Sequence, residues 1–149
     1  MRDKISEQRV NALHPAVRQI FKTFIETCEE KGNITLRVSE GFRSIAYQNE
    51  LYAQGRTKPG KIVTKATGGQ SFHNYGLAID LVRMNGKEVD WSFDMAKLLK
   101  YMPAGMVWGG NFKSIKDKPH FEMTFGNAWQ TLLIRYQKKD FVSGEFVRI

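Results

Sequence analysis

A single cysteine, Cys28, occurs in the 149 residues of the chain. One thiol excludes an intramolecular disulfide and a zinc site built from several thiolates. No apolar run is long enough to span a membrane, and the polar N-terminal segment lacks the apolar stretch of a secretory signal peptide. We therefore expect a protein that is made in the cytoplasm without a signal peptide and does not insert stably into a membrane.

Positive charge exceeds negative charge, with 23 Lys and Arg against 15 Asp and Glu and a net charge of +8. Such a balance favours anionic partners, namely nucleic acid, an acidic membrane surface or an anionic cell-wall polymer. The basic residues are scattered, and no basic run is longer than Lys138-Lys139. This distribution favours a solvated surface over a nucleic-acid groove, so we expect no nucleic-acid partner. Tight, salt-sensitive binding to DNA would support the opposite interpretation.

The length and the absence of internal repeats predict one domain over residues 1–149. Apolar spacing and turn residues predict helices over 14–32, 45–55, 92–102 and 128–139. Alternating apolar residues predict strands over 34–38, 76–84, 87–91 and 120–125, and a short strand in the tail, with loops over 56–70 and 103–119. Asn85-Gly86 is the expected hairpin turn, and Ser92 the expected cap of the third helix. Since the later strands are mostly hairpin-connected, the fold class is α+β, with a small antiparallel sheet and helices packed around it.

The segment SFHNYGLAID, residues 71–80, carries His73 and Asp80 on either side of a turn. In the strand that follows the turn, Asp80 points away from the face of its apolar neighbours Ile79 and Leu81. The Asp80 carboxylate is therefore expected in a cleft, where it and the His73 imidazole can converge on one point. A catalytic zinc ion needs three protein ligands and one open position.

A third ligand is available in DKPHFE, residues 117–122, where His120 begins an expected strand. Asp117, three residues earlier, adds a second carboxylate in the position of a general base. Each of these side chains also has a structural interpretation, as a surface histidine, a strand-edge charge, a turn cap or a packed strand residue. Spacing alone leaves both interpretations open. His14, which precedes Pro15, is interpreted as a helix-entry residue and is left out of the site.

These two segments resemble the paired signature of zinc peptidases that cut bacterial peptidoglycan. The family includes VanY-like D-alanyl-D-alanine carboxypeptidases, VanX-like dipeptidases and the L-alanyl-D-glutamate endopeptidases of phage endolysins. SEGFRSIAYQNELYAQGRT (39–57) resembles the upstream block of the family, and WGGNFKSIKDKPHFEM (108–123) resembles its downstream block. The Asp in DKPHFE and the upstream WGG are most similar to the endopeptidase branch. The resemblance implies the fold shared by D-Ala-D-Ala peptidases and hedgehog-like domains.

The resemblance also implies roles for individual residues. One catalytic zinc ion would be bound by His73, Asp80 and His120, and Asp117 would be the general base. Arg43 would stabilise negative charge on the substrate carbonyl, a task suited to a fixed guanidinium charge. The remaining matches to family positions are the expected substrate-binding residues Ser71, Gln48 and Trp108. Trp108 can also be read as a packed core aromatic, and Glu122 as either a partner of the site or strand surface.

We therefore expect a zinc-dependent peptidase that cleaves the peptidoglycan stem peptide between L-alanine and D-glutamate, acting as an endolysin or autolysin. One alternative is a D-alanyl-D-alanine carboxypeptidase, and another is a non-catalytic cell-wall-binding module on the same fold. Nearly the whole chain is used by the catalytic fold, so we expect no separate wall-binding domain. We further expect a monomer that acts on the cell wall after release from the cytoplasm.

Overall fold

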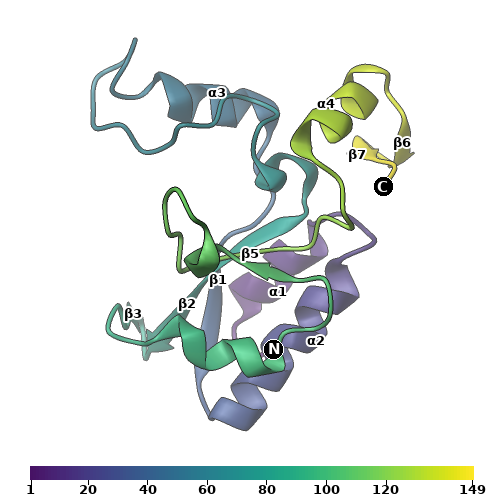
Figure 1. Ribbon diagram of the computed structural model, residues 1–149. Coiled ribbons are helices and arrows are strands. Elements are labelled where there is room, and N and C mark those ends of the chain that lie inside the picture. The colour runs from purple at the N-terminus through teal and green to yellow at the C-terminus, as the bar shows by residue number, and fades with distance from the viewer.

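A small antiparallel sheet organises the molecule in a computed structural model that describes residues 1–149 (Figure 1). The helices are α1 (Lys4–Asn11), α2 (Arg18–Gly32), α3 (Ile45–Ala53) and α4 (Trp129–Gln137), with short 3-10 turns η1 (Phe72–Tyr75), η2 (Met95–Tyr101) and η3 (Gly109–Asn111). The strands are β1 (Thr35–Glu40), β2 (Ala78–Asn85), β3 (Glu88–Val89), β4 (Val107–Trp108), β5 (His120–Glu122), β6 (Phe141–Ser143) and β7 (Phe146–Val147). The α+β prediction is confirmed.

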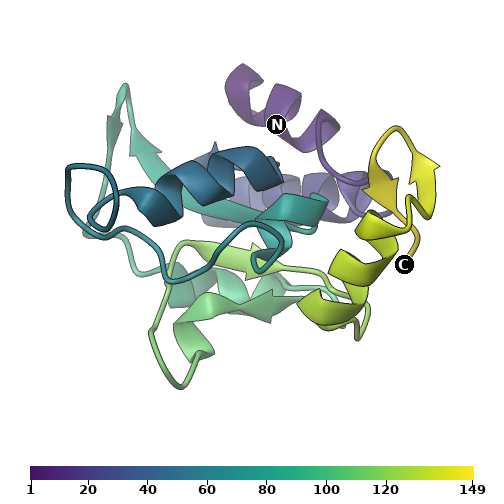
Figure 2. The ribbon, with the colours of Figure 1, turned by 90° about the horizontal axis from the view of Figure 1, so that it is seen from above.

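Strand β2 lies at the centre of the main sheet, whose order is β1-β2-β5-β4 with β3 paired to the far end of β2. Asp80 of β2 is in register with Glu40 of β1 on one side and with His120 of β5 on the other. At the other end of the β1–β2 ladder, Thr35 pairs with Met84. Polar residues of three neighbouring strands therefore meet at one end of the sheet. Seen from above, α3 and the loop that follows it lie in front of this sheet (Figure 2).

The hydrophobic core fills the space between α2 and the sheet. Phe21, Phe24 and Cys28 of α2 are buried there, and the Phe24 ring contacts the Phe121 ring of β5 with centroids 5.3 Å apart. Burying a side chain as large as Phe contributes about 1.5–3 kcal/mol, so this layer holds the strands that carry the polar end of the sheet. Burial also raises the pKa of the Cys28 thiol to about 12, which agrees with an inert core cysteine. No helix has both the length and the apolar character required to cross a membrane.

The structure adds a helix, α1, that the sequence pattern did not predict. Its first turn is capped by the Asp3 side chain, which accepts a hydrogen bond from Ser6 N at 3.0 Å. Ser6 is buried and its hydroxyl accepts a hydrogen bond from Val38 N in β1 at 2.8 Å. The helix therefore depends on polar contacts with the edge strand β1. The spacing of apolar residues in the sequence does not indicate such contacts.

Other elements also differ from the prediction, and α2 begins at Arg18 rather than at residue 14. The segment expected as an α-helix over 92–102 forms the 3-10 turn η2, and its cap is Asp94, which accepts from Ala96 N, rather than Ser92. The hairpin turn lies one residue later than predicted, because Asn85 pairs with Glu88 across it. The tail forms the two-stranded β6–β7 hairpin instead of a single strand, and β4 lies within the segment expected as a loop.

His14 is buried and joins the entry of α2 to the C-terminal hairpin. Its Nε2 donates to Val147 O at 2.7 Å, and its Nδ1 accepts from Ala16 N at 3.1 Å. Only the neutral ring can make both bonds, because a protonated Nδ1 would face another donor. Burial accordingly lowers the pKa of His14.

We expect this histidine to make the fold sensitive to acid. An unfolded histidine has a pKa of about 6.5, and the folded pKa is lower, so the unfolded state takes up the proton first. The stabilising contribution is complete above the unfolded value and decreases as the pH falls through it. Melting temperatures at pH 7.5 and pH 5 should therefore differ more for the wild type than for His14→Gln. An equal pH dependence for both proteins would show that His14 is not the sensitive group.

Candidate metal centre

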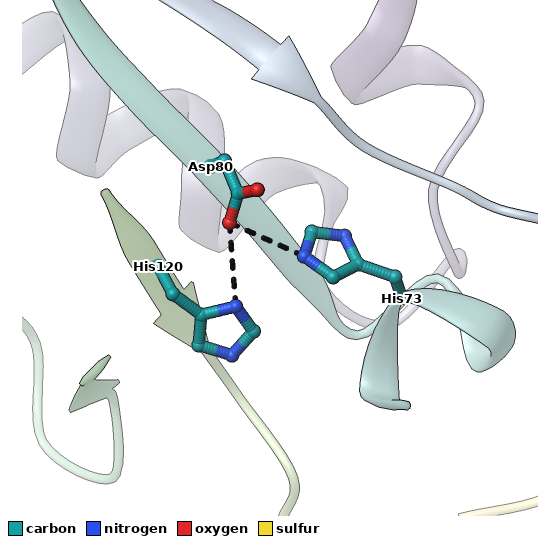
Figure 3. Close-up of side chains that lie close together, drawn as sticks. All are labelled: His73, Asp80 and His120. Atoms are coloured by element: carbon teal, nitrogen blue, oxygen red, sulfur yellow. Dashed lines mark hydrogen bonds and ion pairs between the residues drawn. The ribbon is translucent and has the colours of Figure 1, made fainter. Parts of the chain in front are cut away.

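Three side chains from different elements converge at the polar end of the sheet: His73 from η1, Asp80 from β2 and His120 from β5 (Figure 3). Asp80 Oδ1 lies 3.2 Å from His73 Nε2 and 3.3 Å from His120 Nδ1. The three possible ligand atoms, one from each residue, all lie within 4.8 Å of one another. The structure thus brings together the three residues that the sequence predicted as ligands.

The remaining ring nitrogen of each histidine is held by a second partner. His73 Nδ1 donates to the carbonyl oxygen of Gly41 at 2.8 Å, and His120 Nε2 donates to Glu122 Oε1 at 2.9 Å. Hydrogen bonds of this kind fix ring orientation and leave the opposite nitrogen lone pair facing a metal. Of the two interpretations of Glu122, the structure favours the partner of the site.

Local sequence explains why His73 reaches the site from a 3-10 turn. The Ser71 hydroxyl accepts from His73 N, and the Asn74 side chain accepts from Ser71 N, which closes a capping box around η1. Gly76 ends the turn with a φ of 68°, a conformation that glycine adopts without strain. A Cβ at Gly76 would lie 2.6 Å from His14 N, so the close approach to the α2 entry also requires glycine.

The geometry of the three side chains fits a zinc ion. Zinc bonds of about 2.0–2.2 Å to nitrogen and oxygen in a tetrahedron place neighbouring ligand atoms about 3.4 Å apart. The two distances from Asp80 Oδ1 to the histidine nitrogens, 3.2 and 3.3 Å, match that edge. Two imidazoles and one carboxylate are also a ligand set that zinc accepts in catalytic sites.

The electrostatics of the cluster favour an ionised Asp80. Burial alone would raise the pKa of this carboxyl, but hydrogen bonds from His120 and His73 outweigh burial and hold it below its usual range. Burial likewise would lower the pKa of His120, and its bonds to Asp80 and Glu122 instead raise it to about 9. The carboxylates that hold a proton on His120 would equally stabilise a metal ion, which would bind to the neutral ring with release of that proton.

Asp117 lies beside this cluster rather than within it. Its Oδ2 is 4.0 Å from His120 Nδ1, and its side chain is 50% exposed. Asp117 N donates to Gly109 O at 2.9 Å and His120 N donates to Asp117 O at 3.1 Å, so the backbone of residue 117 is fixed relative to the ligand. Burial and then the nearby charge of Asp80 raise the pKa of Asp117, which makes this carboxylate a stronger base.

Trp108 lies in the core, as in one of its two interpretations, and is not among the residues that line the cleft, while its role in substrate binding stays a prediction. Its ring is 7% exposed and belongs to the core, and its Nε1 donates to Lys118 O at 2.6 Å. The indole thereby braces the loop that carries Asp117. The same loop also packs closely against Gly109. A Cβ at this position would lie 2.3 Å from Asp117 O and 2.9 Å from His120 Cβ.

We expect Gly109→Ala to reduce activity by displacing both Asp117 and His120. A displacement of about 1 Å at a catalytic group can cost on the order of 10²-fold in rate. The matched control is Gly32→Ala at the end of α2, where the new Cβ would be 3.4 Å from Ile34 Cγ1, a distance at the edge of ordinary contact. Steady-state rates and melting curves of both variants test this. A Gly109→Ala protein with wild-type kcat would contradict the role of this close approach.

Arg43 reaches the cleft from the loop before α3, whereas Gln48 does not. The Arg43 guanidinium lines the cleft, and its Nε lies 3.5 Å from Glu40 Oε1. Gln48 is 0% exposed and is not among the residues that line the cleft, and its expected role in substrate binding stays a prediction. Its Oε1 accepts from Arg43 Nη1 at 2.9 Å, which makes it a partner of the arginine.

The cluster opens into a cleft of about 430 Å³. Ser71 and Asp117 line it together with the three candidate ligands, while Tyr47, Leu51 and Val63 provide apolar walls from α3 and the following loop. Ser71 is thus placed where contact with a substrate is feasible, and its role in binding stays a prediction. The volume of this cleft lies within the range of roughly 300–1,000 Å³ that is usual for ligand sites.

Comparison with known proteins places this arrangement in a family. The family model described as VanY, D-alanyl-D-alanine carboxypeptidase, matches residues 10–137. The chain belongs to the VanY family. It is 43% identical over 127 residues to the peptidoglycan L-alanyl-D-glutamate endopeptidase CwlK of Bacillus subtilis (strain 168), covering 74% of this chain and 73% of that protein. It is also 31% identical over 84 residues to the L-alanyl-D-glutamate peptidase of Listeria phage A118, covering 50% of this chain and 30% of the phage protein.

Solved structures of VanY-like proteins share the fold. The L-Ala D-Glu endopeptidase ChiX of Serratia marcescens superposes with a TM-score of 0.58 at 28% identity, covering 81% of this chain and 87% of ChiX. The vancomycin resistance D,D-pentapeptidase VanY, solved in complex with Zn(II), gives a TM-score of 0.51 at 14% identity, over 74% of this chain and 72% of that one. At 14% identity, the similarity to this VanY structure is evidence for a shared fold only.

One functional group of this VanY-family site, the Gly41 carbonyl, was not predicted from the sequence, and the role of another, Glu122, was left open. The carbonyl of Gly41 holds His73, and a backbone acceptor leaves no trace in residue type. Glu122 was open to either interpretation, although its position two residues after His120 on one strand places both side chains on the same face. That spacing is the signal that could have assigned it.

Proposed function

We propose that this VanY-family protein is a zinc-dependent peptidoglycan endopeptidase that hydrolyses the stem peptide between L-alanine and D-glutamate. The observation that carries the proposal is the open His73–Asp80–His120 cluster with Asp117 at its edge. The choice of bond is supported by the name of the Bacillus subtilis relative, which is 43% identical over most of both chains. Peptidoglycan is thus the proposed substrate, and the fold over residues 1–149 is proposed to act as one catalytic domain and as a monomer.

His73, Asp80 and His120 would hold one zinc ion, which would supply a Lewis acid and lower the pKa of a water molecule to about 7. Asp117 takes the proton from the attacking water and returns it to the leaving amine. Its exposed position at the cluster edge and its raised pKa suit both transfers. Arg43 directs a permanent positive charge into the cleft, where it stabilises the negative charge that develops on the scissile carbonyl oxygen.

The alternative activity is that of a D-alanyl-D-alanine carboxypeptidase, which the description of the family favours. A synthetic stem pentapeptide that ends in D-alanyl-D-alanine contains both candidate bonds. We expect the zinc-loaded protein to release L-alanine and leave a peptide that begins with D-glutamate. Release of the terminal D-alanine alone would instead establish the carboxypeptidase.

A non-catalytic wall-binding module is the other alternative. Such a module has no need for a base beside the cluster or a guanidinium in the cleft, yet Asp117 and Arg43 occupy these positions. Zinc-loaded, folded protein that binds sacculi and cleaves no stem peptide would favour the module. The proposed site of action remains the cell wall, after release of a chain made in the cytoplasm.

Lysines on the two loops that contribute to the cleft are expected to attract the anionic wall. Val63 and Thr64 of one loop and Asp117 of the other line the cleft, and the same loops carry Lys61, Lys65 and Lys116. Charge near a cleft raises association rates by about 10-fold or more, and salt screens this effect. The triple change of these lysines to glutamine should lower kcat/KM on sacculi about tenfold at low salt and little at high salt.

The matched control removes the same charge from the opposite end of the sheet. Lys31, Lys97 and Lys100 line a groove between the end of α2 and η2, away from α3 (Figure 1). Their triple change to glutamine should leave kcat/KM near the wild-type value at both salt concentrations. Equal losses in the two triple variants would show that net charge, rather than charge at the cleft, governs attack on the wall.

A further inference from the structure

Gln48 is a fully buried amide whose polar atoms are all hydrogen-bonded. Its Oε1 accepts from Arg43 Nη1 at 2.9 Å and from Asn74 Nδ2 at 3.4 Å. Its Nε2 donates to Ala66 O at 2.8 Å and to Thr64 Oγ1 at 3.4 Å. Burying an amide is costly unless its groups are satisfied, so this side chain is retained for the contacts it makes.

These contacts join three segments that surround the metal cluster. Arg43 precedes α3, Asn74 lies in η1 next to His73, and Ala66 lies in the loop after α3. Two further bonds tie the first two segments: Asn74 Nδ2 donates to Arg43 O at 3.0 Å, and Arg43 N donates to His73 O at 3.0 Å. Asn74 Oδ1 also accepts from Gly69 N at 3.0 Å at the end of the loop, whereas Gln48 connects both segments to Thr64 and Ala66 beside the cleft.

The bond to Gln48 is the only hydrogen bond of the Arg43 side chain. Arg43 Nε is buried without a hydrogen-bond partner, and the Glu40 carboxylate is 3.5 Å away. A guanidinium held at one corner can present its other N–H groups to the cleft. The direction of that charge therefore depends on the amide oxygen of Gln48.

The loop over residues 56–70 has no regular secondary structure and relies on side-chain contacts near the cleft. Besides Gln48, the loop is held by Asn49 Oδ1, which accepts from Gly68 N at 2.7 Å, and by Arg56, whose Nη2 donates to Thr64 O at 3.1 Å. Val63 and Thr64 of this loop line the cleft. The Asn49 contact holds the loop without touching Arg43, whereas the Gln48 contact holds both.

We infer that Gln48 is a positioning residue that couples the Arg43 guanidinium to the Val63–Ala66 wall of the cleft, so that both are set as one unit. The inference rests on the proposed function for the role of Arg43. Gln48 touches no substrate and acts through the two groups it orients. The coupling has two separable halves, since the amide oxygen serves Arg43 and the amide nitrogen serves the loop.

Three variants separate these halves. Gln48→Leu removes both, and Gln48→Glu keeps an acceptor for Arg43 but sets a carboxylate against Ala66 O. Asn49→Ala loosens the loop alone. Two readouts are measured on each zinc-loaded protein: kcat and KM on the stem pentapeptide, and the rate of limited trypsin cleavage after Lys61 and Lys65 in the loop.

Gln48→Leu should lower kcat by about 10²-fold, as expected for a misplaced catalytic charge, and should speed trypsin cleavage of the loop. Gln48→Glu should speed cleavage to the same extent while keeping kcat within about tenfold of wild type, because charge-assisted pairing still holds Arg43. Asn49→Ala should speed cleavage and raise KM with little change in kcat. All variants should keep the wild-type zinc content.

Several results would overturn the coupling. A wild-type trypsin rate for Gln48→Leu would show that Gln48 does not hold the loop. A kcat of Gln48→Glu as low as that of Gln48→Leu would show that an acceptor at this position does not orient Arg43. If Gln48→Leu does not fold, the contrast between Gln48→Glu and Asn49→Ala still decides both halves. Wild-type protein that cleaves no stem peptide would contradict the proposed function. The trypsin assay does not depend on peptidase activity, so it would still test whether Gln48 holds the loop.

Discussion

Replacement of Asp117 by asparagine is expected to lower kcat by about 10²–10⁴-fold, the usual contribution of a positioned general base, while zinc stays bound. Asp117 Oδ2 is 4.0 Å from His120 Nδ1, which is too far for a shared hydrogen bond and leaves the ligand cluster intact without it. Asparagine keeps the size of the side chain and removes only its capacity to accept a proton. The measurement is kcat on the stem pentapeptide together with zinc content by atomic absorption.

A matched control for this loss is Asp140→Asn near the C-terminus. Asp140 forms an exposed ion pair with Arg148, and exposed pairs contribute little. This variant should keep wild-type kcat and zinc content. If Asp117→Asn were as active as Asp140→Asn, another group would have to serve as the base. If Asp117→Asn lost its zinc, Asp117 would have to be counted among the ligands.

Replacement of Asp80 by alanine is expected to abolish both zinc binding and activity. Its Oδ1 lies within 3.3 Å of both histidine nitrogens, and its loss leaves two imidazoles, one ligand fewer than a catalytic zinc site needs. Glu122→Gln provides the graded comparison, because it alters only the partner of His120 Nε2. Loss of such a partner typically weakens metal affinity about 10–100-fold, and loss of the ligand itself should cost more.

Competition with a chromogenic zinc chelator orders the three affinities. We expect wild type to bind most tightly, Glu122→Gln next and Asp80→Ala below detection, with melting temperature in excess zinc following the same order. An Asp80→Ala protein that retains one tightly bound zinc ion would show that the metal lies elsewhere. Equal affinities of Glu122→Gln and wild type would remove the role assigned to the His120–Glu122 bond.

The convergence of His73, Asp80 and His120 could be anticipated from the sequence because strand alternation directs Asp80 away from its apolar neighbours. Spacing could not decide between a metal site and structural side chains; the resemblance to the peptidases was needed for that. Gln48 and Trp108 were expected to bind substrate, and the structure places both in buried positions behind the cleft. A family motif marks a position near the site, but burial decides whether a side chain faces the cleft or braces a residue that does.

In the fold, too, an apolar pattern predicted a helix that packs in the core but not a helix held by polar contacts. The apolar face of α2 was sufficient to predict that helix. The α1 helix depends on Asp3 and Ser6, whose contacts with Arg37 and Val38 exist only once β1 is in place. Asp94 caps η2 in place of Ser92 because the Ser92 hydroxyl instead donates to Asp90 Oδ1.

Digestion of purified sacculi by zinc-loaded wild type and by Asp117→Asn, followed by mass spectrometry of the products, tests the central claim most directly. We predict that wild type alone releases peptides that begin with D-glutamate and leaves L-alanine on the glycan, whereas the variant releases none although it binds zinc. Wild-type products that lack only a terminal D-alanine would contradict the proposed bond. Absence of any product from folded, zinc-bound wild type would contradict the assignment of this site as a peptidase.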